Sequence, residues 1–432
     1  MSEMHAETVP FVRETMLPPA PPPIREAGAV RWLRQNLFSG PVNTILTLLG
    51  IAIIWFIVSH FWPWFAHSVW RADSLAQCRE IIARTWGEGA SGACFAVIRE
   101  RWHQYMFGFY PPELYWRPLL AFGLLMVALA PILFSESRII RRIVLIVSAT
   151  ATLILALALG IPTPALILAA TAMIGAIAVA ERQPTRLLIF SALYPFLGVW
   201  LLWGGSLWGP LMVLASFGLG ALAWVVVARL LPLLAAAAAI IVALVWWIGF
   251  AGRAAEDLQN LLPLAITPVA SDQFGGFLLA ITIGIAGIAL SLPMGIMLAL
   301  ARRSDMFLVK SLSVMFIEFI RGVPLISLLF VASLLLNYFL PPGTNFDIIL
   351  RVIIMVTLFA AAYMAEVIRG GLAALPKGQY EAADALGLDY WKAQRLIILP
   401  QALKISIPGI VSTFIGMFKD TTLVTFVGLF DP

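Results

Sequence analysis

Three ionisable residues, Glu318, Arg321 and Glu366, interrupt the apolar C-terminal part of the chain. An arginine can bind a carboxylate through two parallel hydrogen bonds, so one interpretation has Arg321 meeting the carboxylate of a substrate. The other interpretation is an intramolecular ion pair near the inner membrane face, which would fix a chain break at Gly322–Pro324. The sequence leaves both open, and the ion pair is the preferred interpretation.

The stretch Glu381–Pro400 is the longest polar interruption in the C-terminal half. Pro376 can begin a helix, and Gly387 can adopt the left-handed conformation that ends it. Asp389 can then cap a second helix that stops at Pro400. Two short helices joined at a glycine are typical of a docking surface, although an amphipathic linker between membrane spans would show the same pattern.

The sequence carries none of the common enzyme motifs. It contains no Gly-x4-Gly-Lys-Ser/Thr phosphate loop, no Gly-x-Ser-x-Gly turn and no His-Glu-x-x-His zinc motif. The four histidines lack the spacing of metal ligands; they are His5, His60, His67 and His103. We therefore predict a protein that is not an enzyme, with no catalytic residues and no ATP site, cofactor or metal of its own.

The only two cysteines, Cys78 and Cys94, fall in one long hydrophilic loop. A disulfide between them would close this loop if it lies in an oxidising compartment outside the cytoplasm. The alternative is a pair of free thiols.

The composition predicts an all-α polytopic membrane protein. Of the 432 residues, 61% are hydrophobic and 12% are charged, whereas soluble domains carry about 25% charged residues. Many apolar stretches reach the roughly 20 residues that a spanning helix needs. Long unbroken apolar runs exclude the alternating pattern of a membrane barrel. The net charge of +5 comes from short basic loops that set topology, so it does not indicate a nucleic-acid partner.

The N-terminal half predicts a tail followed by seven spans. Residues 1–40 are polar and proline-rich, which predicts a disordered cytoplasmic tail. Residues 41–250 form the spans, with the hydrophilic loop 63–116 outside. The expected spans are 42–62, 117–134, 143–161, 164–180, 187–203, 210–229 and 232–250. The loops placed inside carry the arginines, so the charge pattern puts the N-terminus in the cytoplasm.

The chief predicted domain boundary is a polar outer connection at residues 251–272. After it, residues 273–432 form a second region. Its spans are expected at 273–301, 308–340, 348–368 and 405–427, with 308–340 interrupted near Pro324. The basic segment 369–404 between the last two spans is expected in the cytoplasm.

The spacing within Glu381–Pro400 resembles a known docking motif. It consists of Glu381-Ala382-Ala383, three residues, Gly387, nine residues, and Ile397-x-Leu399-Pro400. This arrangement resembles the coupling loop of permease subunits of binding-protein-dependent ABC importers. Three further stretches resemble the polar amino-acid branch of that family; they are FIRGVP (319–324), EVIRGGLAALPK (366–377) and FKDTTL (418–423). Within that branch, the chain most resembles the M-type permease of general L-amino-acid importers. The resemblance covers about 273–430, whereas about 140–260 matches nothing known.

The resemblance implies a permease core of the type I importer kind in a bacterial inner membrane. A periplasmic amino-acid-binding protein would deliver an L-amino acid to this chain and a homologous second permease. Separate ATP-binding subunits would drive transport from the cytoplasm. The helix 379–387 would sit in a groove of the ATPase, with Glu381 meeting a cation, Ala382 and Ala383 permitting close approach, and Gly387 making the turn.

Two alternatives stay open at this point. A stand-alone ion-coupled secondary transporter would need broken helices in matching halves. An assembly subunit without transport would keep the fold alone.

Lys419 and Asp420 either pair with each other or line the inner mouth of a path. Members of the family usually continue with a further loop and span, so the resemblance also implies that residues 273–432 lack a final helix, and it leaves open whether the chain still functions.

Overall fold

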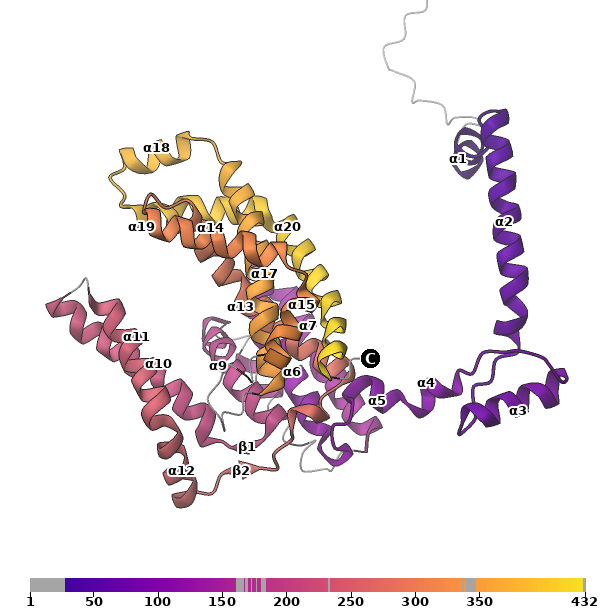
Figure 1. Ribbon diagram of the computed structural model, residues 1–432, viewed down its shortest axis with the longest axis horizontal. Coiled ribbons are helices and arrows are strands. Elements are labelled where there is room, and N and C mark those ends of the chain that lie inside the picture. Colours follow the sequence, from indigo (N-terminus) through magenta and orange to yellow (C-terminus); the bar gives the residue numbers. More distant parts are fainter. Residues whose placement is uncertain are drawn as a thin grey trace, which may run out of the picture. The chain divides into compact units, whose positions relative to one another are not determined.

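Helices carry almost all of the described chain, and two short strands accompany them (Figure 1). The computed structural model describes residues 28–160, 184–231, 234–335 and 347–429, together with isolated positions between 167 and 179 and residue 338. The chain divides after Arg101 into two units. The predicted all-α fold class is confirmed.

The first unit begins with α1 (Gly28–Asn36) and α2 (Pro41–Ala66). Proline stands at the first turn of α2, where its missing N–H removes no helical hydrogen bond. At 26 residues, α2 is long and apolar enough to cross a membrane. Helix α1 differs from the tail without regular structure that was expected there, and residues 1–27 of that tail lie outside the described residues.

A disulfide-closed segment follows α2 in the same unit. It contains α3 (Leu75–Trp86) and α4 (Ala96–Glu100), and Ser74 caps α3 by accepting a hydrogen bond from a first-turn N–H. Cys78 and Cys94 form a disulfide with their Cα atoms 5.9 Å apart. Cys78 is fully buried. The sequence left a disulfide and free thiols open, and in the structure the two cysteines are bonded.

The second unit starts with helices that precede the predicted core. In chain order the elements are α5 (Trp102–Phe107), η2 (Pro112–Leu114), α6 (Trp116–Leu133), α7 (Arg138–Ala158), α9 (Pro184–Trp203), β1 (Gly205–Ser206), α10 (Trp208–Leu230), α11 (Ala235–Val245), η4 (Trp246–Phe250), α12 (Ala251–Leu261) and β2 (Ala265–Ile266). Helix α6 packs against α7 and α9, and α10 packs against α11 and α12. The two strands pair antiparallel.

The stretch α11–η4–α12 corrects one predicted boundary. It runs as a single candidate span, Ala235–Leu261. From the sequence, we expected a span to end at residue 250 and a polar connection to occupy residues 251–272. Residues 251–261 contain strong helix formers and no proline, so the helix continues through their charges. The non-helical connection therefore begins only at Leu262.

The remaining elements form the core of the second unit. They are η5 (Ser271–Gln273), α13 (Gly276–Arg302), α14 (Phe307–Gly322), α15 (Leu325–Phe330), η6 (Val331–Leu335), α17 (Ile348–Ala373), α18 (Gly378–Ala385), α19 (Tyr390–Ala393), η7 (Gln394–Ile398), α20 (Leu399–Asp420) and η8 (Thr421–Val427). Helix α17 packs most extensively on α13 and also contacts α20 and α14. Figure 1 shows α18 and α19 at one end of α17 and the β1–β2 pair toward the other.

Small residues let α17 approach α20 closely. A Cβ built on Gly371 would collide with Ser406 and would lie 2.6 Å from the carbonyl oxygen of Ala402. Helix pairs in membranes depend on such close contacts, because lipid offers apolar side chains no hydrophobic advantage in associating. Met364 and Ile368 are fully buried beside this contact. The sequence of α17 therefore fixes its distance from α20.

Within the described residues, eight helices are long and apolar enough to cross a membrane, or nine if a bent pair counts as one span. The bent pair is α14 with the segment from Leu325, and the two parts meet at 101°. Pro324 lacks an N–H and disfavours helix at the residue before it, which explains a break at the predicted interruption. The predicted span at 164–180 lies largely outside the described residues.

Candidate functional site

The loop between α17 and α20 is built by local signals. Helix α18 ends at Ala385, and Gly387 follows its cap with φ +66°, in the left-handed region that glycine adopts without strain. The N–H of Leu388 donates to the carbonyl of Ala383 at 3.2 Å, which satisfies a group at the end of α18. Asp389 then caps α19 by accepting from the N–H of Lys392 at 3.0 Å. The two helices are therefore joined by a defined turn.

The carboxyl group of Asp389 has a lowered pKa. The hydrogen bond from the Lys392 N–H, aided by the Lys392 ammonium 3.0 Å away, holds the pKa of the Asp389 carboxyl below its ordinary value. The carboxylate is exposed, so this cap shapes the start of α19 and contributes little beyond it.

The seven residues of the motif separate into two groups. Ala383 is 1% exposed, and Ile397 and Leu399 are half-buried, so these three attach the loop to the body of the unit. The other four are exposed; they are Glu381, Ala382, Gly387 and Pro400. Among the described residues Glu381 makes no ion pair, which leaves its carboxylate available to a cation on another molecule.

The loop also carries exposed apolar side chains that the sequence analysis did not select. Leu386 is 72% exposed, Trp391 is 70% exposed and Leu396 is 64% exposed. Large apolar groups clustered in one polar loop mark a surface that another protein covers. The adjacent Tyr390 and Trp391 in an otherwise polar stretch are the sequence signal that could have found them.

Polar contacts fix the underside of this loop. Arg303, at the end of α13, donates to the hydroxyl of Tyr380 at 3.0 Å, and its guanidinium lies 5.6 Å from the centre of the same ring. Gln401 of α20 donates to the side chain of Gln379 at 2.9 Å. The loop is therefore held at both ends, and a cavity of about 260 Å³ remains between α18, α19 and the end of α13.

A charged cluster lies at the inner end of α17, with Glu366 at its centre. Arg302 pairs with Glu366 and also with Glu318 at 3.0 Å. Arg369 pairs with Glu366 at 2.9 Å. The structure thus brings together the three predicted residues Glu318, Arg321 and Glu366, and it adds Arg302 and Arg369, which the sequence analysis missed because they belong to other turns and helices.

Arg321 is the arginine that the cluster holds least tightly. Its Nη1 lies 3.9 Å from Glu366, its buried Nε has no hydrogen-bond partner among the described residues, and its guanidinium lies 5.4 Å from the ring of Tyr363. A guanidinium carries five N–H donors, and the 3.9 Å separation from Glu366 is longer than a hydrogen bond. Arg321 therefore takes part in the ion-pair cluster and keeps hydrogen-bonding capacity for a further carboxylate.

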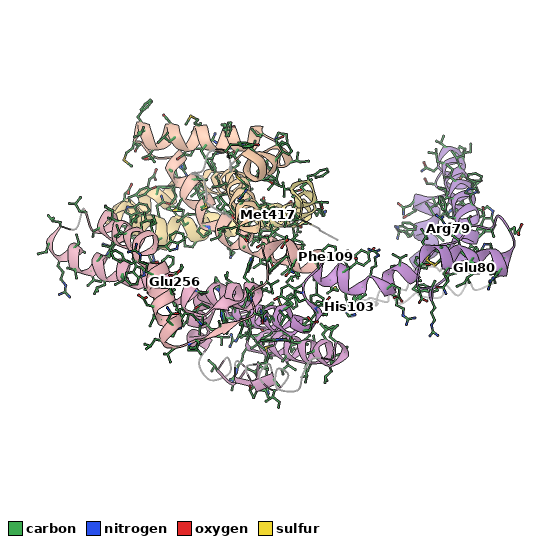
Figure 2. All side chains as sticks on the ribbon, turned by 60° about the horizontal axis from the view of Figure 1, so that its bottom comes forward. Arg79, Glu80, His103, Phe109, Glu256 and Met417 are labelled. Carbon is green, nitrogen blue, oxygen red and sulfur yellow. A yellow bond between two sulfur atoms is a disulfide. The ribbon has the colours of Figure 1, made fainter. Side chains whose placement is uncertain are left out.

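A cavity of about 270 Å³ lies between the middle of α17 and the second half of α20. Tyr363 and Thr413 line it, together with Met417, which Figure 2 labels among the core helices. Asp420 is the acid in its wall. No ion pair between Asp420 and Lys419 is present in the described residues, so this carboxylate faces the cavity rather than its neighbour.

Tyr363 connects the cavity with the charged cluster. Its ring lines the cavity that contains Asp420 and also lies beside the guanidinium of Arg321. Tyr363 therefore lines a cavity that has one acid in its wall and lies beside one incompletely satisfied base. Such an arrangement suits a small molecule that carries both an ammonium and a carboxylate group.

Comparisons with known proteins find relatives among transport permeases. The family described as binding-protein-dependent transport system inner membrane component matches residues 291–432. The glutamate/glutamine/aspartate/asparagine transport system permease protein BztC of Rhodobacter capsulatus is 55% identical, over 98% of this chain and 87% of that protein. The inner membrane amino-acid ABC transporter permease protein YhdY of Escherichia coli is 35% identical, over 96% of this chain and 83% of that protein. A crystal structure of an amino acid ABC transporter with histidines is 31% identical, over 35% of this chain and 69% of the solved one, with a TM-score of 0.32.

Proposed function

The chain belongs to the family of inner-membrane components of binding-protein-dependent transport systems, and we propose that its loop Glu381–Pro400 receives the motion of a separate ATPase. The resemblance drawn from that loop is confirmed. The protein is a multi-pass permease subunit of an amino-acid ABC importer in the inner membrane. The N-terminus and the loop lie on the cytoplasmic side in this proposal, because the arginines gather there.

The observation that carries the coupling proposal is the two-sided loop. The side of the loop that faces the body of the unit is fixed by buried Ala383 and by the contact between Arg303 and Tyr380. The side that faces away presents Glu381 together with exposed Leu386 and Trp391. The unpaired carboxylate and the exposed apolar side chains suit the binding of a partner protein. The fixed position of the loop suits a partner that pushes on it, because a flexible loop would absorb the movement.

The substrate in this proposal is an L-amino acid of the polar class. BztC is named for glutamate, glutamine, aspartate and asparagine transport. Asp420 would meet the α-ammonium group, and Arg321, beside Tyr363, would meet a carboxylate. A periplasmic binding protein and a homologous second permease complete the assembly, and ATP is bound by the partner subunits.

The test uses the complete complex in proteoliposomes, with ATP inside and a labelled amino acid outside. We expect Glu381→Ala and Gly387→Asp to lower ATP-driven uptake at normal insertion of the chain, because the first removes the charge and the second places a side chain at a left-handed position. Glu256→Ala is the control, since Glu256 (labelled in Figure 2) is exposed on α12, which Figure 1 shows at the opposite end of the unit from α18 and α19.

Two outcomes would contradict the proposal. One is normal ATP-driven uptake by both loop variants at normal assembly. The other is uptake by wild type that needs no ATPase and follows an ion gradient, which would support a stand-alone secondary transporter instead.

A further inference from the structure

Three side chains form a hydrogen-bonded bridge at the outer end of α17. The indole N–H of Trp203, at the end of α9, donates to the hydroxyl of Ser271 at 2.7 Å. That hydroxyl donates its single proton to a carboxylate oxygen of Asp347. The other oxygen of Asp347 accepts from the N–H of Leu350 at 3.0 Å and so caps α17. We call Trp203, Ser271 and Asp347 the outer bridge.

The surroundings of the outer bridge are fixed by further contacts. The N–H of Val269 donates to the carbonyl of Trp203 at 2.8 Å, and Arg117 donates to the carbonyl of Thr267 at 2.5 Å. Ser271 is 8% exposed. The segment between α12 and α13 is therefore tied to α6 and α9 on one side and to α17 on the other.

Aromatic packing reinforces the same place. Phe274 is fully buried, with its ring 4.6 Å from that of Trp203 and 5.5 Å from that of Tyr110. The Tyr110 hydroxyl donates to the carbonyl of Leu202 at 2.8 Å. Burial raises the pKa of Tyr110 to about 12, so the hydroxyl keeps its proton well into the alkaline range.

Helix α17 connects this fixed point with the loop that faces the ATPase. It runs for 26 residues without proline, which corresponds to about 39 Å. Its inner end carries Glu366 and leads within five residues to α18. A straight helix that is held at one end and pushed at the other tilts, whereas a helix free at both ends can be displaced as a whole.

We propose that the outer bridge is a pivot that makes α17 tilt when the loop is pushed, with Ser271 as a positioning residue for coupling. The proposal rests on the coupling function proposed above. It also gives the N-terminal helices a role: Trp203 and Ser271 lie before residue 291, where the family match begins, and Asp347 lies within the match. The helices α6 and α9 therefore supply a fixed body that the matched region does not contain.

The central variant is Ser271→Ala, which removes the bridging hydroxyl and leaves the Asp347 cap on α17 intact. Trp203→Phe is a second variant, because it deletes the indole N–H and keeps a ring against Phe274. Ser313→Ala is the matched control: Ser313 is also 8% exposed, and its hydroxyl bonds only to the backbone of its own helix, at Val309.

The first measurement is the amount of amino acid transported per ATP hydrolysed by the complete complex in proteoliposomes. We expect this ratio to fall by about fivefold in Ser271→Ala and Trp203→Phe, the size expected for the net loss of one hydrogen bond, and to stay unchanged in Ser313→Ala. An unchanged ratio in both bridge variants, or an equal fall in Ser313→Ala, would overturn the proposal.

The second measurement does not depend on transport. Spin labels at Leu350→Cys on α17 and Leu211→Cys on α10 report the distance across the outer side; both side chains are exposed, and the described residues contain no free cysteine to be labelled by mistake. We expect one narrow distance in wild type with and without nucleotide, and a broad one in Ser271→Ala.

A broad wild-type distance would show that α17 is not held, and the pivot would be wrong. If the wild-type distance is narrow but the complex shows no ATP-driven uptake, the coupling function is contradicted. The outer bridge would still be supported by that result. The two proposals therefore fail in distinguishable ways.

Discussion

The two ends of α17 are held by different kinds of interaction. At the outer end, every donor of the bridge, including the Ser271 hydroxyl, makes one directional hydrogen bond to one acceptor. At the inner end, Glu366 is shared among three arginines. A directional bond fixes one geometry, whereas a carboxylate among several cations can exchange partners with little change in energy. The comparison indicates that one helix can be fixed at one membrane face and remain adjustable at the other.

The largest effect is expected when the inner cluster loses its centre. Glu366→Ala leaves Arg302 and Arg321 partly buried without their shared acid, which should lower the free energy of unfolding by about 3–5 kcal/mol. Thermal unfolding of the purified chain measures this loss. Glu318→Ala is the control, because Glu318 is 55% exposed and an exposed pair contributes about 0–1 kcal/mol. Equal melting temperatures for the two variants would contradict the central place of Glu366.

An intermediate effect is expected where α17 touches α20 between the two ends. Gly371→Val places a side chain against Ser406 and Ala402, and overpacking of this kind costs about 1–3 kcal/mol. Gly370→Val is the matched control, since nothing lies within 4 Å of a Cβ at the neighbouring position. Melting curves of the two variants separate crowding from the loss of a glycine. If Gly370→Val were the more damaging, the close approach of the two helices would be wrong.

The smallest effect concerns the loop beyond the inner end. Because the pKa of Asp389 is lowered in the folded chain, its cap stabilises α19 above the ordinary pKa of an aspartate, and this contribution disappears as the pH falls through the lowered value. Hydrogen exchange of the Lys392 amide should therefore accelerate, relative to its intrinsic rate, below about pH 4. Asp389→Asn should abolish this acid-dependent change. A protected Lys392 amide in acid would exclude the carboxylate as the cap.

Local signals in the sequence were sufficient for the bend at Pro324 and for the shape of the loop. Pro324 marks the bend between α14 and α15, and Gly387 and Asp389 mark the turn between α18 and α19. Each acts through its own φ angle or through a hydrogen bond a few residues away. The sequence therefore predicts these features without knowledge of how the helices pack.

The sequence did not predict the contacts that join distant helices. Trp203 and Ser271 are 68 positions apart, and Ser271 and Asp347 are 76 apart. Arg302 reaches Glu366 across 64 positions. Serine, tryptophan and arginine occur on many helix ends, so their types alone do not indicate which of them meet. The identity of the pairs depends on the packing of α9, α13 and α17, which a single sequence does not specify.

The disulfide between Cys78 and Cys94 offers a test of which side of the membrane its segment occupies. Thiols stay reduced in the cytoplasm, so in the proposed topology we expect this bond to form only after the segment has crossed the membrane. Oxidation of the two cysteines is therefore a marker of translocation during biogenesis. A chain inserted in the wrong orientation would expose two free thiols to the cytoplasm, and a thiol-specific label would count such chains directly.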